Sequence, residues 1–91
     1  MNTQTKPQNK HSNSTAAQEA RIADYLIENI RATTIELREI LDIMHPAGRI
    51  KGLRAKDWDI VTHWEYHPTA CGKMHRVGVY VLFKIPKDRK V

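Results

Sequence analysis

Four side chains of metal-binding type recur at every fourth position in the second half of the chain: His63, His67, Cys71 and His75. Imidazole and thiolate are ligands that zinc prefers. A four-residue spacing aligns side chains on a helix, but this region alternates apolar and polar residues as a strand does. In a hairpin, His63 and His75 would meet across the strands. Because the helical alignment is missing, we expect no metal and no cofactor.

No group of residues has the pattern of a catalytic centre. The chain has no nucleophile with a plausible base, no phosphate-cradling loop and no carboxylate pair on an apolar wall. A domain of 91 residues also has little room for a deep pocket. We therefore expect neither an enzyme nor a small-molecule substrate.

The cations are concentrated in the second half of the chain. Residues 15–42 carry three bases and six acids, a net charge of −3, whereas residues 43–91 carry ten and four, a net charge of +6. The whole chain has a formal charge of +5 and a sequence pI of about 9.6. A basic region of this kind suggests a polyanion as partner.

A first helix is expected to begin near Thr15 and to end between residues 29 and 32. Thr15 and Gln18 have the spacing of a capping box. The apolar residues at helical spacing form its buried face: Ile22, Ala23, Leu26, Ile27 and Ile30. The charged residues form a solvated face: Glu19, Asp24, Glu28 and Arg31.

A second helix is expected to begin at Thr33, with Glu36 completing a capping box, and to end near residue 41 or 42. Its buried residues are Leu37, Ile40 and Leu41. In the connection that follows, at residues 42–45, we expect Ile43 and Met44 to enter the core.

A third helix is expected to begin at Pro46, because proline suits the first helical position, and to end near Asp57. Ile50 and Leu53 point inward on a helical projection. The outer side carries small residues and cations: Gly48, Lys51, Gly52 and Ala55, flanked by Arg49, Arg54 and Lys56. This side of the helix suits a close approach to a polyanion.

From Trp58 onward the apolar period changes to two, which predicts a strand. Residues 67–74 are expected to form a loop, and a second, valine-rich strand follows from His75 to Phe83. The two strands form an antiparallel hairpin, with Trp58 and Trp64 expected on one buried face. A short edge strand near residues 32–34 is expected to pair with this hairpin.

The strings PAGRIKGLRAKDWDIVT and GKMHRVGVYVL resemble a family of small helix-turn-helix proteins common in bacteriophages and prophages. The positions that carry the resemblance are Arg49-Ile50, Leu53-Arg54, Trp58-Asp59-Ile60, Gly72, His75-Arg76 and Tyr80-Val81-Leu82. Relatives often have glycine at Asp42 and Asp57, and aspartate tolerates the left-handed conformation better than most residues. The resemblance covers about half the chain and implies a winged-helix module that binds DNA.

The order of elements predicts an α+β winged helix-turn-helix, with three helices followed by a two-stranded β-hairpin wing. Residues 15–83 would form the domain, residues 1–14 a flexible basic arm and residues 84–91 a basic tail. Cys71 is the single cysteine, and the sequence has no bilayer-spanning run or signal core. We therefore expect a cytoplasmic protein without a membrane partner.

This fold predicts binding to double-stranded DNA, with residues 46–57 in the major groove and residues 67–76 on the backbone. The expected contact residues are His45, Ala47, Gly48, Arg49, Lys51, Gly52, Arg54, Ala55, Lys56, Lys73, His75 and Arg76. Structural roles remain open for four of these residues. Arg49 and Arg54 would pair with Glu36 or Glu39, and the two glycines would pack against another helix or subunit.

The expected role is a phage-type transcriptional regulator, either repressor or activator, acting as a homodimer on a two-fold site. One alternative is an excisionase-like architectural protein. Another is a protein-interaction module that binds and inhibits a host protein or nucleoprotein complex. Binding of RNA or single strands ranks last, because it needs exposed aromatic residues along a basic groove and the sequence pattern buries most of them.

Overall fold

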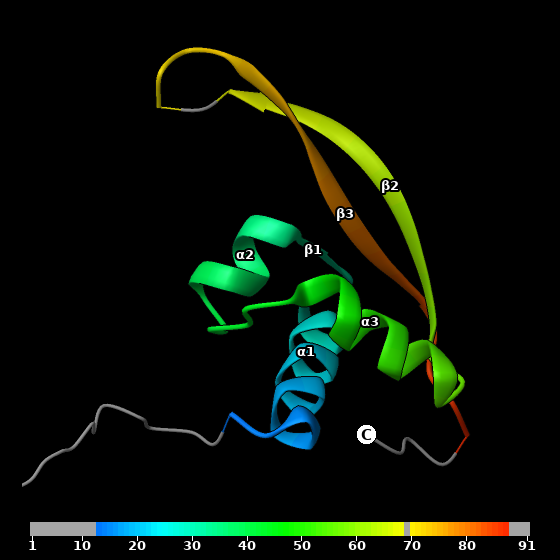
Figure 1. Cartoon of the computed structure of the whole chain (residues 1–91). Helices are drawn as coiled ribbons and strands as arrows, with labels where there is room; N and C mark the ends of the chain where they lie inside the picture. The colour runs from blue at the N-terminus through cyan, green and yellow to red at the C-terminus, as the bar shows by residue number, and fades with distance from the viewer. Residues whose placement is uncertain (1–12, 69, 88–91) are drawn as a thin grey trace, which may run out of the picture.

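The computed structural model describes residues 13–68 and 70–87. The elements in order are α1 (Thr15–Asn29), β1 (Arg31–Thr33), α2 (Thr34–Glu39), α3 (Pro46–Ala55), β2 (Asp59–Pro68) and β3 (Met74–Lys84). The hairpin of β2 and β3 leaves the end of α3 and arches over α2 (Figure 1). The predicted α+β order is confirmed, with β1 as an additional third strand. Of the expected arm and tail, residues 13–14 and 84–87 are described, and the rest lies outside the described residues.

Helix α1 begins where predicted, but its cap is one residue earlier. The hydroxyl of Ser14 accepts a hydrogen bond from the Ala17 N–H at 3.1 Å. The Gln18 side chain donates to the Asn13 carbonyl instead of closing a box with Thr15. A serine hydroxyl directly before the helix satisfies one of the unpaired N–H groups of the first turn, so Thr15 is not needed as the cap.

Helix α1 ends in a reversal at Ile30, whose φ of 71° is unusual for a β-branched residue. The Ile30 carbonyl accepts the Leu82 N–H at 2.7 Å, so the reversal connects α1 to the sheet. The prediction that Ile30 is buried is wrong, because the reversal turns the side chain outward and leaves it 53% exposed.

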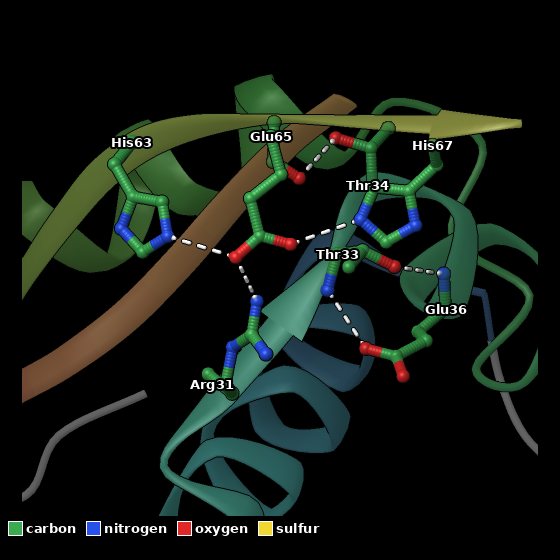
Figure 2. Close-up of polar contacts among 8 residues, drawn as sticks. Arg31, Thr33, Thr34, Glu36, His63, Glu65 and His67 are labelled. Atoms are coloured by element: carbon green, nitrogen blue, oxygen red, sulfur yellow. Dashed lines mark hydrogen bonds and ion pairs between the residues drawn. The ribbon is translucent and has the colours of Figure 1, made fainter. Parts of the chain in front are cut away.

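Helix α2 has the predicted capping box, which Figure 2 shows in detail. The Thr33 hydroxyl accepts from the Glu36 N–H at 3.0 Å, and the Glu36 carboxylate accepts from the Thr33 N–H at 2.8 Å. The helix ends at Glu39, earlier than expected. Leu37 is therefore the one residue of α2 in the core, and Ile40 is exposed.

The connection between α2 and α3 turns at Asp42, which has the left-handed conformation expected there, with a φ of 60°. The Ile43 N–H bonds to the Leu37 carbonyl at 3.0 Å, and the Ile43 side chain is fully buried. Met44 is 73% exposed, so its predicted place in the core is wrong. Ile43 is therefore the residue of this connection that packs in the core.

The sheet has the order β1-β3-β2 and is antiparallel throughout. Strand β1 pairs only with residues 79–81 of β3, which confirms the expected edge strand one residue earlier in the chain. Strands β2 and β3 extend to Pro68 and Met74, so the loop is shorter than predicted. Beyond β1, the two strands of the wing pair only with each other.

The core lies between the helices and the base of the sheet. Its residues are Ile22, Ala23, Leu26, Ala32, Leu37, Ile43, Ile50, Leu53, Trp58, Ile60 and Tyr80. Trp58 is buried as expected, whereas Trp64 is 54% exposed, so its predicted place in the core is wrong. No helix in the described part of the chain is long and apolar enough to cross a membrane.

Candidate nucleic-acid interface

Helix α3 is held by its inward side and leaves its outward side exposed. Pro46 stands at the start of the helix, and Ile50 and Leu53 are fully buried. Ile50 and Leu53 belong to the core cluster and fix the helix against it. The exposed residues on the outward side are Ala47, Gly48, Lys51, Arg54 and Ala55. Nothing lies within 4 Å of the position that a Cβ of Gly48 would occupy, so a partner can approach the backbone closely there.

Gly52 does not belong to this outward side. A methyl group on Gly52 would overlap the Glu19 carboxylate of α1, so the glycine allows α1 and α3 to pack together. Glu19, expected in solvent, is 3% exposed and accepts a hydrogen bond from Lys56 Nζ at 2.6 Å. The ion pair satisfies the buried carboxylate. Gly52 and Lys56 therefore position α3, which is the packing alternative that the sequence left open for Gly52.

Arg49 also lies on the side of α3 that faces α1. Its Nη1 donates to the Thr15 hydroxyl at 2.7 Å. Its Nε is buried and has no hydrogen-bond partner within the described residues. The alternative pairing of Arg49 with Glu36 or Glu39 is wrong, because α1 rather than α2 provides the partner.

Arg54 connects α3 to the wing. Its Nε donates to the Ile60 carbonyl at 2.8 Å, and its Nη2 donates to the Thr62 hydroxyl at 2.7 Å. The planar guanidinium group forms two directed hydrogen bonds, which restrain the angle between the helix and the start of β2. The structural role expected for Arg54 is thus observed, with β2 as the partner in place of Glu36 or Glu39.

The three predicted wing residues lie near the tip of the hairpin. Lys73 belongs to the loop, and His75 and Arg76 are exposed on β3. The guanidinium of Arg76 lies 4.3 Å from the centre of the Trp64 ring, a cation–π contact across the two strands. His75 lies opposite His67 in the strand pairing.

The arching wing encloses a cleft of about 700 Å³ against α2 and the start of α3. Its walls come from three parts of the described chain, namely α2, the start of α3 and the wing. The lining residues are Thr34, Ile35 and Arg38, then His45, Pro46, Ala47 and Gly48, and finally Trp64, His67, Pro68, His75, Arg76, Val77, Gly78 and Tyr80. This cleft is larger than we expected for so small a domain. It exists because the hairpin extends beyond the core. The sequence prediction omitted Arg38 and Trp64 from this surface.

The outer face of the wing carries a polar network centred on Glu65 (Figure 2). Its Oε2 lies 2.6 Å from Arg31 Nη2 and 3.3 Å from His63 Nε2, and its Oε1 lies 2.9 Å from His67 Nε2. The hydrogen bonds of His67 and His63 hold the pKa of Glu65 below its usual value, and the charge of Arg31 acts in the same direction.

Two of the four side chains at regular spacing, His63 and His67, belong to this network. His63 and His67 both contact Glu65, and His63 lies opposite Val79 rather than His75 in the strand pairing. The expected meeting of His63 and His75 is therefore wrong. Among residues 13–68 and 70–87, no three His, Cys, Asp or Glu side chains are grouped in a way that would hold a metal ion.

The comparison with protein families agrees with this arrangement. Residues 17–85 match the family described as a winged helix-turn-helix domain, and the matched segment includes nearly all of α1 and all the later elements. A search of curated proteins found no match. The α2–α3 pair, the exposed outer side of α3 and the following hairpin are the parts by which this DNA-binding fold is defined. The chain belongs to the winged helix-turn-helix domain family.

Proposed function

We propose that this protein binds double-stranded DNA, with the outward side of α3 in the major groove and the wing on the neighbouring backbone. The observation that carries the proposal is the outward side of α3 itself. It combines small residues with Lys51, and the core holds the opposite side rigidly. A major groove admits a helix whose surface is small, and lysine contacts guanine or phosphate there.

The predicted contact residues have two kinds of role in this proposal. Those that meet DNA are His45, Ala47, Gly48, Lys51, Ala55, Lys73, His75 and Arg76, all of them exposed. Those that position α3 through contacts within the chain are Arg49, Gly52, Arg54 and Lys56. His45 precedes the first turn of α3, where the helix dipole favours a phosphate.

The biological role belongs to the same proposal. The resemblance of residues 46–82 to phage and prophage proteins supports a phage-type transcriptional regulator in the cytoplasm. Such a regulator would bind as a homodimer to half-sites about 34 Å apart, or a multiple of that distance. Sedimentation with and without a selected DNA site would measure the stoichiometry. One chain per half-site on a two-fold sequence is expected.

The decisive test compares two lysines on one duplex. Fluorescence anisotropy with a mixed-sequence duplex across a salt series should give a log–log slope of about −0.9 per phosphate contact for the wild type. Lys51→Glu should weaken binding at least about tenfold, because it places a carboxylate in the groove. Lys87→Glu makes the same change of net charge in the exposed tail and should have a much smaller effect. Equal losses in both variants, or none in Lys51→Glu, would contradict the groove placement.

A further inference from the structure

We infer that the cleft beneath the wing binds single-stranded DNA, with the Trp64 ring as its stacking platform. In the strand pairing, Trp64 and Tyr66 share the sheet face of Ile60 and Tyr80, which pack in the core. The two aromatic residues are 54% and 66% exposed. Trp64 lines the cleft, and Tyr66 extends the same face of β2 outside it. Two aromatic rings on alternate residues, about 7 Å apart along a strand, form a surface on which unpaired bases stack.

The Trp64 ring is already held in place. The Arg76 guanidinium lies against it, and Gly78 stands directly opposite Trp64 on β3. A Cβ on Gly78 would lie 3.3 Å from the ring and 3.1 Å from the Thr34 hydroxyl, so the glycine leaves room for the indole to lie across the strand. A ring fixed before binding loses little entropy when a base stacks on it. The Arg76 guanidinium plane is itself a surface on which bases stack.

The charge of the cleft fits an anionic strand. Two arginines, Arg38 and Arg76, contribute to its walls together with three histidines, and no Asp or Glu lies among the described residues that line it. Apolar contacts come from Ile35, Pro46 and Tyr80. A volume of about 700 Å³ is within the range of pockets that enclose a small planar ligand. The cleft therefore combines stacking, cations and space, as single-strand sites do.

A base pair within a duplex cannot use this platform, because both faces of its bases are covered by the neighbouring pairs. Stacking on Trp64 therefore selects unpaired bases. Ala47 and Gly48 belong both to the cleft wall and to the outward side of α3. His45, His75 and Arg76 of the cleft wall are likewise contacts of the proposed duplex, so a single strand and a duplex would compete for this surface. This activity goes beyond the duplex binding proposed above and does not depend on it.

The experiment uses the full chain and a labelled oligo(dT) of about 16 nucleotides, a length in the range of known single-strand sites. Anisotropy should show binding by the wild type that Trp64→Ala weakens about 5- to 150-fold, the range measured for one lost stacking contact. Phe83→Ala is the matched control, since it removes an exposed aromatic ring that does not line the cleft. It should leave the affinity unchanged. Circular dichroism verifies that each variant is folded.

Intrinsic fluorescence gives a second and independent readout. Oligo(dT) should quench the wild-type emission and leave Trp64→Phe unquenched, because the remaining Trp58 is buried. Absence of oligo(dT) binding at low salt, equal affinities in Trp64→Ala and wild type, or quenching that persists in Trp64→Phe would each overturn the inference. The Lys51→Glu result on duplex DNA is a separate measurement, so the failure of one proposal would leave the other standing.

Discussion

The base and the far end of the wing are built from the same two strands, yet they differ in what covers them. At the base, Ile60 and Tyr80 pack against the helices and are 3% and 7% exposed. Farther along the same sheet face, Trp64 and Tyr66 are more than half exposed. Alternation along a strand therefore predicts which residues share a face. How closely the helices approach that face decides how much of it is core, since a cleft separates Trp64 from α2 and α3.

The largest expected effect tests this difference directly. Ile60→Ala should lower the free energy of unfolding by about 2–5 kcal/mol, because it leaves a cavity in the core. Trp64→Ala should lower it by about 1 kcal/mol, mainly through the lost contact with Arg76. Urea unfolding followed by circular dichroism measures both. If Trp64→Ala is as damaging as Ile60→Ala, the far end of the wing packs as a core does, and the cleft is not an open surface.

Within α3 the same contrast between a covered and an uncovered side occurs at two glycines. Gly52→Ala should destabilise the protein by about 1–2 kcal/mol, because the methyl group must displace the Glu19 carboxylate from Lys56. Gly48→Ala in the first turn faces open space and should stabilise it by up to about 0.5–1 kcal/mol, because alanine loses less backbone entropy than glycine when a helix forms. Thermal and urea unfolding should give opposite signs.

A second variant identifies the cause of the Gly52 effect. In a Glu19→Ala background the carboxylate is absent, so Gly52→Ala should become neutral or stabilising, a coupling that a double-mutant cycle measures. If the loss persists without Glu19, the backbone of α1 rather than the carboxylate limits the space at Gly52.

The sequence predicted the elements whose signals are local. The Thr33–Glu36 capping box and the proline at the start of α3 lie where the pattern placed them. Asp42 and Asp57 have the left-handed conformation that the family resemblance implied. The prediction that Ile50 and Leu53 of α3 are buried was also correct, because ten residues are enough to show the 3.6-residue period of a helix. Local rules therefore gave the order of elements and the winged helix-turn-helix fold.

What the sequence did not predict depends on distant partners. Glu19 reads as a solvated residue of α1, and only the approach of Lys56 makes its burial tolerable. Trp64 was predicted to be buried with Trp58, and the pattern of β2 does not reveal the cleft that leaves Trp64 exposed. The DNA contacts predicted on α3 were likewise drawn from a projection of that helix alone. A projection does not show that α1 covers Gly52 or that β2 receives Arg54.

The smallest expected effect concerns the outer face of the wing, where Glu65 joins β1 to β2. Its pKa in the folded state lies below the ordinary 4.5. The folded protein thus binds this proton more weakly than the unfolded chain does. The ionised Glu65 carboxylate therefore stabilises the folded state at pH values above 4.5. This stabilisation is lost as the pH falls through the lower pKa that Glu65 has in the folded state. The effect is small because solvent screens an exposed carboxylate.

Glu65→Gln removes this titration, so the urea midpoint of the wild type should fall more steeply than that of the variant as the pH decreases below 4.5. Glu28→Gln, at an exposed carboxylate of α1, is the control and should follow the wild type. Parallel curves for wild type and Glu65→Gln would mean that Arg31, His63 and His67 do not hold the carboxylate in solution. The link from β1 to β2 would then rest on the pairing of each strand with β3, and the contacts of Arg76 and Gly78 with Trp64 on the opposite face would be unaffected.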